Sequence, residues 1–373
     1  MKVLFPFVGD SIGGSHQSIL ELHRELYKNN ISSCILVHQK GPLSLFLDDI
    51  GVNYDYLPIQ NFAGDKPNIF LILYNALAQF NKIYRYVRQN KISIVHGNDL
   101  RVNLTWTLPV KLSRASYVWH QRTTMSISVL WRFSNVLADH FVTISEYVHQ
   151  SLPKNIGKSK KTLVLNPFNI DIFFEQEVSR RHLNNLYDLP KNAILLGYIG
   201  RLVEWKNIDF LICCFAEYVK RVGLNAHLII VGTGSSEYVD TLKQLVYELR
   251  INNMVTFAGF SSKPSQAISA FDLMIAPSDK EPFGRTIVEA MIQKTPVIAA
   301  NGGGHLEIIK HRDTGWLYHH NDIEDFIAQL KEIVNEHEIV ESTVQKAYEY
   351  ASSKYSSTKH VENMINIYNK LWV

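Results

Sequence analysis

The sequence predicts an α/β protein made of two Rossmann-like domains, each a parallel sheet covered by helices. Three observations lead to this fold class. Short apolar segments of strand length alternate along the chain with segments of helical periodicity. The alternation restarts once, from about Leu189. The chain also has 373 residues, more than one hydrophobic core usually organises. Two such halves are expected to face each other across a ligand-binding cleft.

The first domain is expected to span residues 1–168. Its strands are predicted at Lys2–Val8, Ser33–Val37, Ile92–His96, Tyr117–His120 and His140–Ile144. Between the strands, Ser15–Asn29 and Ile69–Gln89 carry apolar residues at the spacing of a helix. Because strands and helices alternate, the sheet should be parallel, with helices on both faces.

The second domain is expected to span residues 189–355. Its strands are predicted at Ala193–Ile199, His227–Val231, Val255–Ala258, Leu273–Ala276 and Pro296–Ala299. Its helices are predicted at Asn207–Val222, Ser236–Leu249, Pro264–Ala270, Gly284–Ile292 and Gly304–Ile309. The segment Asn169–Asp188 has mixed charge and no clear period, so we interpret it as a connection. The amphipathic end of the chain, about residues 356–373, predicts a helix that packs back on the first domain.

Composition limits the class of function. With 20% charged residues and a net charge of +3, the chain is too balanced for a nucleic-acid binder. The apolar stretch Ile69–Leu73 is far shorter than a membrane span. Cys34, Cys213 and Cys214 lack metal-binding spacing and are expected to be buried, reduced thiols, which favours a cytoplasmic protein.

The segment from Glu281 to Glu289 is the densest candidate for a site. Its two carboxylates are eight residues apart and run from a loop into a predicted helix. Free backbone N–H groups at Gly284–Thr286 would offer a seat for an anion. Carboxylates accept charge-assisted hydrogen bonds from sugar hydroxyls, worth about 1.5–3 kcal/mol each. The alternative is that both are solvated charges favoured by the helix dipole.

A second candidate follows the predicted strand Ala193–Ile199. Arg201 and Lys206 lie beyond its carboxyl end, where parallel sheets bind ligands. Two cations there would hold a diphosphate and stabilise it as it leaves. No D-x-D sequence occurs in the chain, so we expect no metal and no other cofactor. An ordinary solvated loop is the alternative for either cation taken alone.

These motifs, in this order, resemble the retaining family-four glycosyltransferases, which have the GT-B architecture. The resemblance covers nearly the whole chain and rests on Gly200-Arg201 with Lys206-Asn207 and on Glu281–Glu289. Supporting matches are Val231-Gly-Thr-Gly234, Val255–Gly259, Pro296–Ala299 and Gly303-Gly-His-Leu-Glu307. The resemblance implies a metal-independent, retaining transfer of sugar from a UDP- or GDP-linked donor. The implied acceptor is a glycan or a lipid-linked molecule in surface polysaccharide assembly.

The resemblance also implies roles for individual residues of the second domain. Arg201 and Lys206 would bind the donor diphosphate, Glu289 the ribose, and Glu281 hydroxyls of the donor sugar. The remaining donor-binding set is Gly232, Phe260 (near the base) and the backbone of Phe283, Gly284, Arg285 and Thr286. Arg285 departs from the family, which has an apolar residue at this position.

In the first domain, the resemblance points to one glycine pair and one histidine. Gly13 and Gly14 match the glycine loop that opens the first helix, where glycine permits positive φ and close approach to a phosphate. His120 matches a histidine that touches the donor sugar near the reaction centre. His96 is assigned either to the acceptor cleft or to a structural role.

Two stretches, Ile69–Lys91 and Lys111–Arg132, mix basic with apolar and aromatic residues. This composition suits weak contact with a membrane surface, at the inner face of the membrane. For the first stretch we favour instead a core-facing helix with a solvated basic side; for the second the two interpretations are balanced. Two other functions stay open: a nucleotide-sugar epimerase of the same architecture, and a catalytically inactive partner of a related transferase.

Overall fold

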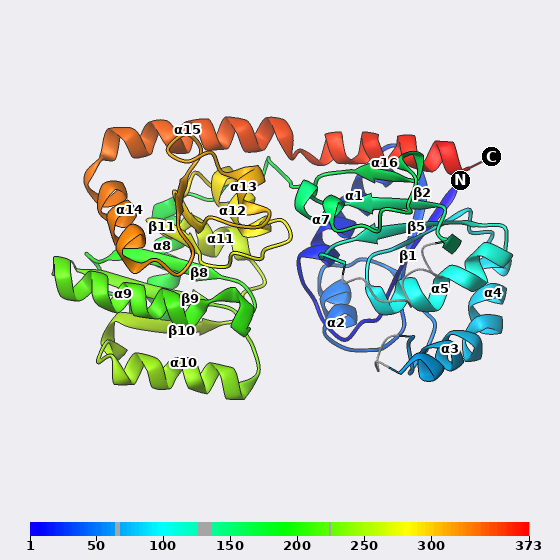
Figure 1. Cartoon of the computed structure of the whole chain (residues 1–373), viewed down its shortest axis with the longest axis horizontal. Helices are drawn as coiled ribbons and strands as arrows, with labels where there is room; N and C mark the ends of the chain where they lie inside the picture. Colours follow the sequence, from blue (N-terminus) through cyan, green and yellow to red (C-terminus); the bar gives the residue numbers. More distant parts are fainter. Residues whose placement is uncertain (64–67, 126–135, 224, 373) are drawn as a thin grey trace. The chain divides into compact units, whose positions relative to one another are not determined.

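The computed structural model describes residues 1–63, 68–125, 136–223 and 225–372 (Figure 1). The chain separates into two compact units. Unit 1 contains Met1–Asn169 together with Ser356–Val373, and unit 2 contains Ile170–Tyr355. The C-terminal segment therefore belongs to the same unit as the N-terminus. Within the described residues, every helix is too short or too polar to span a bilayer.

Unit 1 is built on a parallel sheet with the strand order β3-β2-β1-β4-β5-β6-β7. The strands are β1 (Lys2–Phe7), β2 (Ser32–Val37), β3 (Tyr54–Tyr56), β4 (Ile94–Gly97), β5 (Ser116–Gln121), β6 (His140–Thr143) and β7 (Lys161–Leu163). Side chains alternate between the two faces of β1, so Val3 and Phe5 enter different cores from Leu4. Both faces are apolar, which requires helices on both sides.

The helices of unit 1 cover both faces of its sheet (Figure 1). They are α1 (Gly14–Lys28), α2 (Pro42–Asp49), α3 (Ile69–Ala78), α4 (Phe80–Gln89), α5 (Leu100–Leu112), α7 (Glu146–Gln150) and α16 (Ser357–Leu371), with a 3₁₀ turn at Lys158–Lys160. On one face, Leu22 of α1 and Met364 of α16 share a core with Val3 and Phe5. On the other, Trp106 of α5 is fully buried beside α4.

Unit 2 is built on a second parallel sheet, with the strand order β10-β9-β8-β11-β12-β13. The strands are β8 (Ile194–Ile199), β9 (Ala226–Val231), β10 (Val255–Gly259), β11 (Leu273–Ala276), β12 (Val297–Ala300) and β13 (Trp316–Tyr318). The helices are α8 (Gln176–Tyr187), α9 (Ile208–Val222), α10 (Ser236–Glu248), α11 (Pro264–Ser269), α12 (Arg285–Ile292), α13 (His305–Ile308), α14 (Ile323–Asn335) and α15 (His337–Lys354), with 3₁₀ turns at Glu204–Lys206 and Asn252–Met254.

The connection predicted at Asn169–Asp188 is wrong for most of its length, because this segment contains α8. The helix buries Ser179 and Leu183, which lie one turn apart. A stripe this narrow, half of it polar, does not produce a recognisable apolar period in the sequence.

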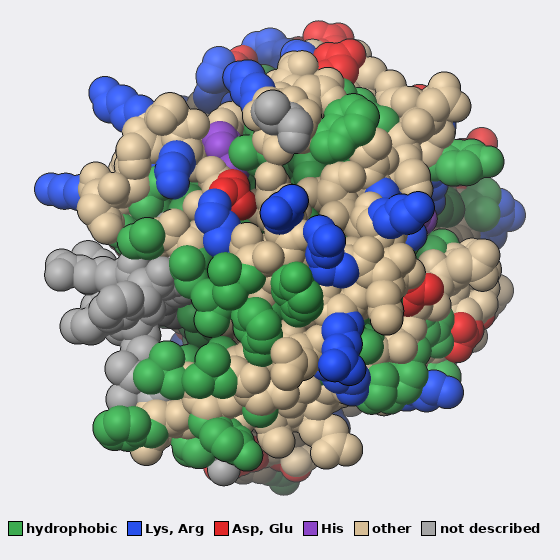
Figure 2. Space-filling view, turned by 90° about the vertical axis from the view of Figure 1, so that its right-hand side faces the viewer, with side chains coloured by type: hydrophobic (Ala, Val, Ile, Leu, Met, Phe, Trp, Pro, Cys, Tyr) green, Lys and Arg blue, Asp and Glu red, His purple; other side chains and the backbone are tan. Residues whose placement is uncertain are grey.

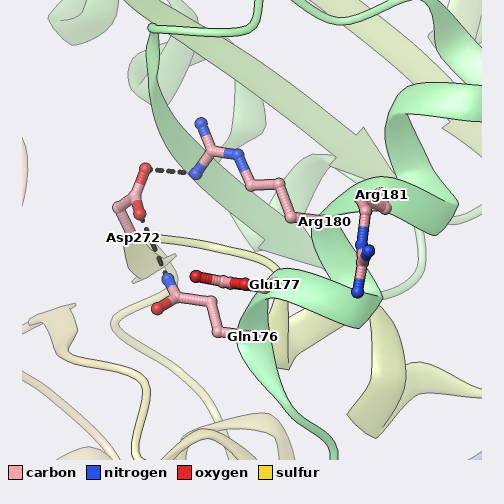
Figure 3. Close-up of a pocket in the computed structure, with 5 residues that line it drawn as sticks. All are labelled: Gln176, Glu177, Arg180, Arg181 and Asp272. Carbon is pink, nitrogen blue, oxygen red and sulfur yellow. Dashed lines mark hydrogen bonds and ion pairs between the residues drawn. The ribbon is translucent and has the colours of Figure 1, made fainter.

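The pocket drawn in Figure 3 is lined by polar residues of α8 and by Asp272. Arg180 forms an ion pair with Asp272, and Gln176 donates from Nε2 to the same carboxylate at 3.1 Å (Figure 3). Asp272 also accepts from the backbone N–H of Leu195 at 2.7 Å. Because Asp272 directly precedes β11, these contacts lie at the amino end of the strand, opposite to the edge where ligands bind.

Other differences from the sequence predictions are smaller. The helix predicted over Ile69–Gln89 is two helices, since α3 ends and α4 begins around Gln79. Strands β3, β7 and β13 were not predicted, because three residues are too few for an apolar pattern. Cys214 is buried as expected, whereas Cys34 and Cys213 are only half-buried.

Candidate functional site

The sheet of unit 2 has a topological switch point between β8 and β11. From β8 the chain continues to β9 on one side, and from β11 it continues to β12 on the other. In open parallel sheets, ligands bind beyond the carboxyl ends of the strands at such a point. The loop Gly200–Asn207 follows β8 and the loop Pro277–Gly284 follows β11. Both motifs found in the sequence therefore lie at the same edge, on either side of the switch point.

An ion pair joins these two loops. The Nζ of Lys206 lies against Oε2 of Glu281, and the two side chains are only 17% and 18% exposed. The ammonium also lies 4.5 Å from the ring centroid of Trp205, which is favourable for a cation. Ser278 donates from Oγ to the carbonyl of Trp205 at 3.1 Å, so the loops are tied together through the backbone as well. The structure thus brings together two residues that lie 75 positions apart in sequence.

Arg201 lies on the same loop but does not join the ion pair. It is exposed and forms no salt bridge with any residue in the described part of the chain. Its backbone carbonyl accepts a hydrogen bond from the hydroxyl of Tyr198 at 2.9 Å, which holds the turn after β8. The guanidinium is therefore available to an anion at this edge.

Helix α12 begins beside the ion pair. Gly284 caps it with φ +105°, a conformation that favours glycine. Arg285 in the first turn forms a salt bridge with Glu289 at 3.4 Å, and both side chains are more than four-fifths buried. Burial raises the pKa of Glu289 above its ordinary value, and the charge of Arg285 offsets part of this rise. Arg285, Thr286 and Glu289 of the sequence motif are therefore carried on a single short helix.

Three consecutive glycines, Gly302–Gly304, support the loop that carries Glu281. The backbone N–H of Gly304 donates to the carbonyl of Glu281 at 2.7 Å. A Cβ on Gly304 would lie 2.6 Å from the Cα of Phe283, so a side chain cannot fit without moving the loop. Sequence reasoning noted part of this glycine run but gave it no role in the site. The sequence signal that could have revealed this role is the position of the glycine run directly after β12, the strand next to β11 in the sheet.

The loops after β8, β9 and β10 also pack on one another through glycine. A Cβ on Gly232 would lie 1.8 Å from the carbonyl oxygen of Gly200, and the N–H of Gly232 donates to Gly259 at 2.7 Å. Phe260, directly after this contact, is 61% exposed. Gly232 therefore has a structural reason to be glycine, whereas Phe260 is a large apolar side chain left open to a ligand.

The switch point of unit 1 lies between β1 and β4, and charged residues meet there as well. Arg101 forms ion pairs with Asp10, which follows β1, at 2.7 Å and with Asp99, which follows β4, at 3.3 Å. This pairing holds the pKa of Asp10 below its ordinary value. Sequence reasoning did not place Asp10 or Arg101 in a site, because charges 91 residues apart give no joint signal.

Neither Gly13 nor Gly14 uses the positive φ that glycine permits. Gly13 caps α1 with φ −170°, and a Cβ there would meet nothing within 4 Å. The positive φ in this loop belongs to Gly9, at +104°, where a Cβ would lie 2.2 Å from the carbonyl oxygen of Gln39. Neither φ nor crowding therefore requires glycine at position 13, although glycine is a favourable N-cap residue.

His120 lies in β5 and is fully buried next to His96 of β4. The Nδ1 of His120 is 2.9 Å from the Nε2 of His96, whose Nδ1 is 2.5 Å from the hydroxyl of Tyr368. Burial lowers the pKa of both imidazoles well below 6.5, and nearby Arg122 lowers it further. Among the described residues nothing pairs with the Nε2 of His120. An unpaired buried nitrogen costs about 1–3 kcal/mol, which marks it as a candidate for a ligand contact.

His96 is thereby a structural partner of His120, one of the two roles considered for it. The structure gathers the candidate residues into two sets, one at the switch point of unit 2 and one at the strand ends of unit 1.

Among the described ranges 1–63, 68–125, 136–223 and 225–372, no group of three or more His, Cys, Asp or Glu is arranged to hold a metal ion.

Comparison with known proteins shows which family the second half of the chain resembles. Residues 180–350 match the family model described as Glycosyl transferases group 1. This match lies within unit 2. The chain is 31% identical over 210 residues to an uncharacterized glycosyltransferase of Methanocaldococcus jannaschii, covering 55% of this chain and 52% of that protein. It is 27% identical over 244 residues to N-acetyl-alpha-D-glucosaminyl L-malate synthase of Bacillus anthracis, covering 65% and 62%. The matches thus span only about half to three fifths of these relatives.

Solved structures extend the likeness to the whole fold. HepE of Anabaena in complex with UDP-glucose superimposes with a TM-score of 0.85 at 20% identity, covering 99% of this chain and 100% of that one. TarM of S. aureus, in a complex with UDP, superimposes with a TM-score of 0.75 at 15% identity, covering 99% of each. The fold of the chain is therefore GT-B, as the sequence predicted.

Proposed function

We propose that the protein transfers a sugar from a UDP- or GDP-linked donor to a glycan or lipid-linked acceptor, in surface polysaccharide assembly. The observation that carries this proposal is the Lys206–Glu281 ion pair at the switch point of unit 2, beside the start of α12. A nucleotide sugar offers both members a partner: its diphosphate binds the ammonium, and its hydroxyls donate to the carboxylate. Solved relatives of this fold are described in complex with UDP and with UDP-glucose.

The other residues of the site fit one donor molecule. Arg201, exposed on the same loop, provides a second cation for the diphosphate. The first turn of α12, at Arg285 and Thr286, lies at the same end of the sheet, and the start of a helix attracts anions. Glu289, largely buried, accepts from the ribose hydroxyls, and exposed Phe260 stacks on or borders the base. His120 of unit 1 contacts the donor sugar.

In this proposal Lys206 and Arg201 perform the electrostatic role that a metal ion has in other transferases. Breaking the sugar–phosphate bond leaves negative charge on the diphosphate and positive charge on the sugar ring. Fixed cations stabilise the departing diphosphate without a reorganisation cost at the moment of reaction. The acceptor oxygen then bonds to the anomeric carbon on the face that the diphosphate leaves, and the departing phosphate takes the proton of the acceptor hydroxyl. Attack on this same face retains the anomeric configuration.

A donor screen followed by a transfer assay tests the proposed function. Selective binding raises the melting temperature by mass action, so one nucleotide sugar should stabilise the full chain more than the others. Incubation of that donor with lipid-linked and free glycans should then release nucleoside diphosphate and lengthen the acceptor. Conversion of the donor to an epimer without any acceptor would contradict the proposal, and so would the absence of any stabilising nucleotide sugar.

Helix α3 suggests how a lipid-linked acceptor is reached. The favoured interpretation of Ile69–Lys91, a core-facing helix, holds for α4 but is wrong for α3. Four large apolar residues of α3 are more than half exposed: Phe70, Leu73, Tyr74 and Leu77. Figure 2 views the molecule from the right-hand side of Figure 1. Hydrophobic side chains gather in the lower part of the face shown there, with Lys and Arg side chains above them. Apolar patches of this kind mark interaction surfaces.

The basic residues that follow α3 favour an anionic lipid surface as its partner. From Asn68 to Asn98 the chain has four basic residues and no acidic one. Exposed Lys82, Arg85 and Arg88 lie on α4, which directly follows α3. The second stretch, Lys111–Arg132, contributes less than expected: Trp119 and Met125 are buried, and residues 126–132 lie outside the described part of the chain.

Vesicle sedimentation tests this contact with the full chain. Phosphatidylglycerol-containing vesicles should bind the protein at low salt, and phosphatidylcholine vesicles should not. Each basic residue near a charged membrane contributes about 1 kcal/mol, so Arg85→Gln with Lys91→Gln should weaken binding roughly 30-fold. Leu73→Ser with Leu77→Ser should also weaken it, whereas Leu186→Ser, an equally exposed leucine of unit 2, should not. Equal binding to both vesicles, or self-association abolished by the α3 changes, would contradict the proposal.

A further inference from the structure

A chain of three side chains links the C-terminal helix to His120. Tyr368 lies in α16, His96 in β4 and His120 in β5, and all three are fully buried. The hydroxyl of Tyr368 is 2.5 Å from Nδ1 of His96, and Nε2 of His96 is 2.9 Å from Nδ1 of His120. Burial and the charge of Arg122 hold the pKa of both imidazoles well below 6.5, so both rings are neutral near pH 7. Each ring then has one N–H donor and one acceptor nitrogen.

Only two directions of hydrogen bonding are compatible with these contacts. In the first, Tyr368 donates to Nδ1 of His96, and His96 donates from Nε2 to Nδ1 of His120. In the second, every bond is reversed: His120 donates from Nδ1 to His96, and His96 donates from Nδ1 to the hydroxyl of Tyr368.

The second direction leaves more groups without partners. The hydroxyl proton of Tyr368 would have no acceptor, since no other contact of that hydroxyl exists within the described residues. The Nε2 of His120 would also be a buried acceptor without a donor. In the first direction, only the N–H at Nε2 of His120 is unsatisfied. Because buried polar groups are costly to leave unpaired, the first direction is favoured.

We propose that Tyr368 is a positioning residue: through His96 it fixes His120 in the tautomer that carries its proton on Nε2. His120 then meets the donor sugar as a hydrogen-bond donor toward a sugar or phosphate oxygen, and it cannot act as a base from that nitrogen. The contact of His120 with the donor sugar rests on the proposed function, whereas the tautomer of His120 does not. The C-terminal helix thereby sets the chemistry of a strand residue 248 positions earlier in the chain.

Nitrogen-15 NMR of the histidine side chains tests the tautomer without any assay of function. In the full wild-type chain, His96 and His120 should both be protonated on Nε2. A proton on Nδ1 of His120 would overturn the proposal. Tyr368→Phe removes only the hydroxyl, so His120 should become a mixture of tautomers in comparable amounts. Tyr117→Phe is the matched control, because it removes another fully buried hydroxyl, bonded to Asn103 at 2.8 Å, and should leave His120 unchanged.

Kinetics then separates positioning from a structural role. Tyr368→Phe should lower kcat/KM by about twofold to tenfold, and Tyr117→Phe should lower it less. In a His120→Ala background, Tyr368→Phe should cause no further loss, because its effect passes through His120. An additive loss in the double variant, or an unchanged tautomer in Tyr368→Phe, would overturn the proposal. If no variant and no wild-type protein turned over any nucleotide sugar, the proposed function would fail while the NMR result would still decide the tautomer.

Discussion

Glu281→Gln should strengthen nucleoside diphosphate binding while it slows sugar transfer. Lys206 is neutralised by Glu281, and both side chains are more than four-fifths buried. A diphosphate that binds Lys206 has to separate this pair and then lies close to the carboxylate charge. Glutamine keeps the shape of the side chain but removes both obstacles. It also weakens the hydrogen bonds accepted from the donor sugar, which lose charge assistance.

The structure allows rough magnitudes for both effects. Two unit charges about 4 Å apart interact by roughly 4 kcal/mol at an effective dielectric constant of 20, most of which is offset by the cost of desolvating them. A net coupling of about 1–2 kcal/mol is then reasonable for a pair with 17% and 18% exposure. Binding of UDP or GDP should tighten about 5- to 30-fold in Glu281→Gln, and the free energy of unfolding should fall by about the same 1–2 kcal/mol.

Calorimetric titration with UDP and with GDP measures the first effect, and denaturant unfolding measures the second. Glu217→Gln is a suitable control, because it breaks an exposed ion pair with Arg221 in the same unit, away from the strand ends. That variant should change neither diphosphate affinity nor turnover. Weaker binding of both diphosphates to Glu281→Gln would refute the reasoning, since it would mean that Lys206 is not released toward the phosphate.

Three further predictions concern Glu289, Gly304 and Gly13. The melting temperature of Glu289→Gln at pH 7 should equal or exceed that of wild type. The pKa of Glu289 is raised in the folded protein, so its charged form destabilises the fold above about pH 4.5. Donor affinity should fall, and a lower melting temperature would contradict this reasoning. Gly304→Ala should destabilise unit 2 by about 1–3 kcal/mol and weaken donor binding, because its Cβ meets the backbone of Phe283; unchanged unfolding curves would refute the crowding. Gly13→Ala should lose no more than about 1 kcal/mol of stability, the difference between glycine and alanine at a helix N-cap, since its Cβ meets nothing; if turnover were unchanged, Gly13 would not serve a ligand.

Much of the site of unit 2 could be predicted from sequence, for a physical reason. Fully buried parallel strands appear as continuous apolar runs, so β8 and β11 are visible, and polar residues that follow them lie at strand ends. Lys206 and Glu281 were found in this way. Their ion pair could not be predicted, because it depends on β8 and β11 being neighbours in the sheet. Strand order is set by the crossover connections, so no local sequence pattern predicts it.

The missed features depend on contacts between distant segments. The bonds from Tyr368 to His96 span 272 positions, and those from Arg101 to Asp10 span 91. The stretch Ile69–Lys91, which contains α3, was interpreted as a core-facing helix with a solvated basic side, but the composition of a helix does not say which of its sides meets solvent. In the loop after β1, positive φ occurs at Gly9 and not at Gly13; a glycine can serve a turn, a close approach or a ligand, and sequence does not distinguish these roles.

The central claim is that Lys206, together with Arg201, takes the place of a metal ion in stabilising the departing diphosphate. The most direct measurement is kcat of sugar transfer by wild type with excess chelator, beside kcat of Lys206→Gln without chelator. We expect the chelator to leave kcat unchanged and Lys206→Gln to lower it by about 10²–10³-fold, as for removal of a group that stabilises transition-state charge. Loss of activity with the chelator, or near-normal turnover by Lys206→Gln, would contradict the account.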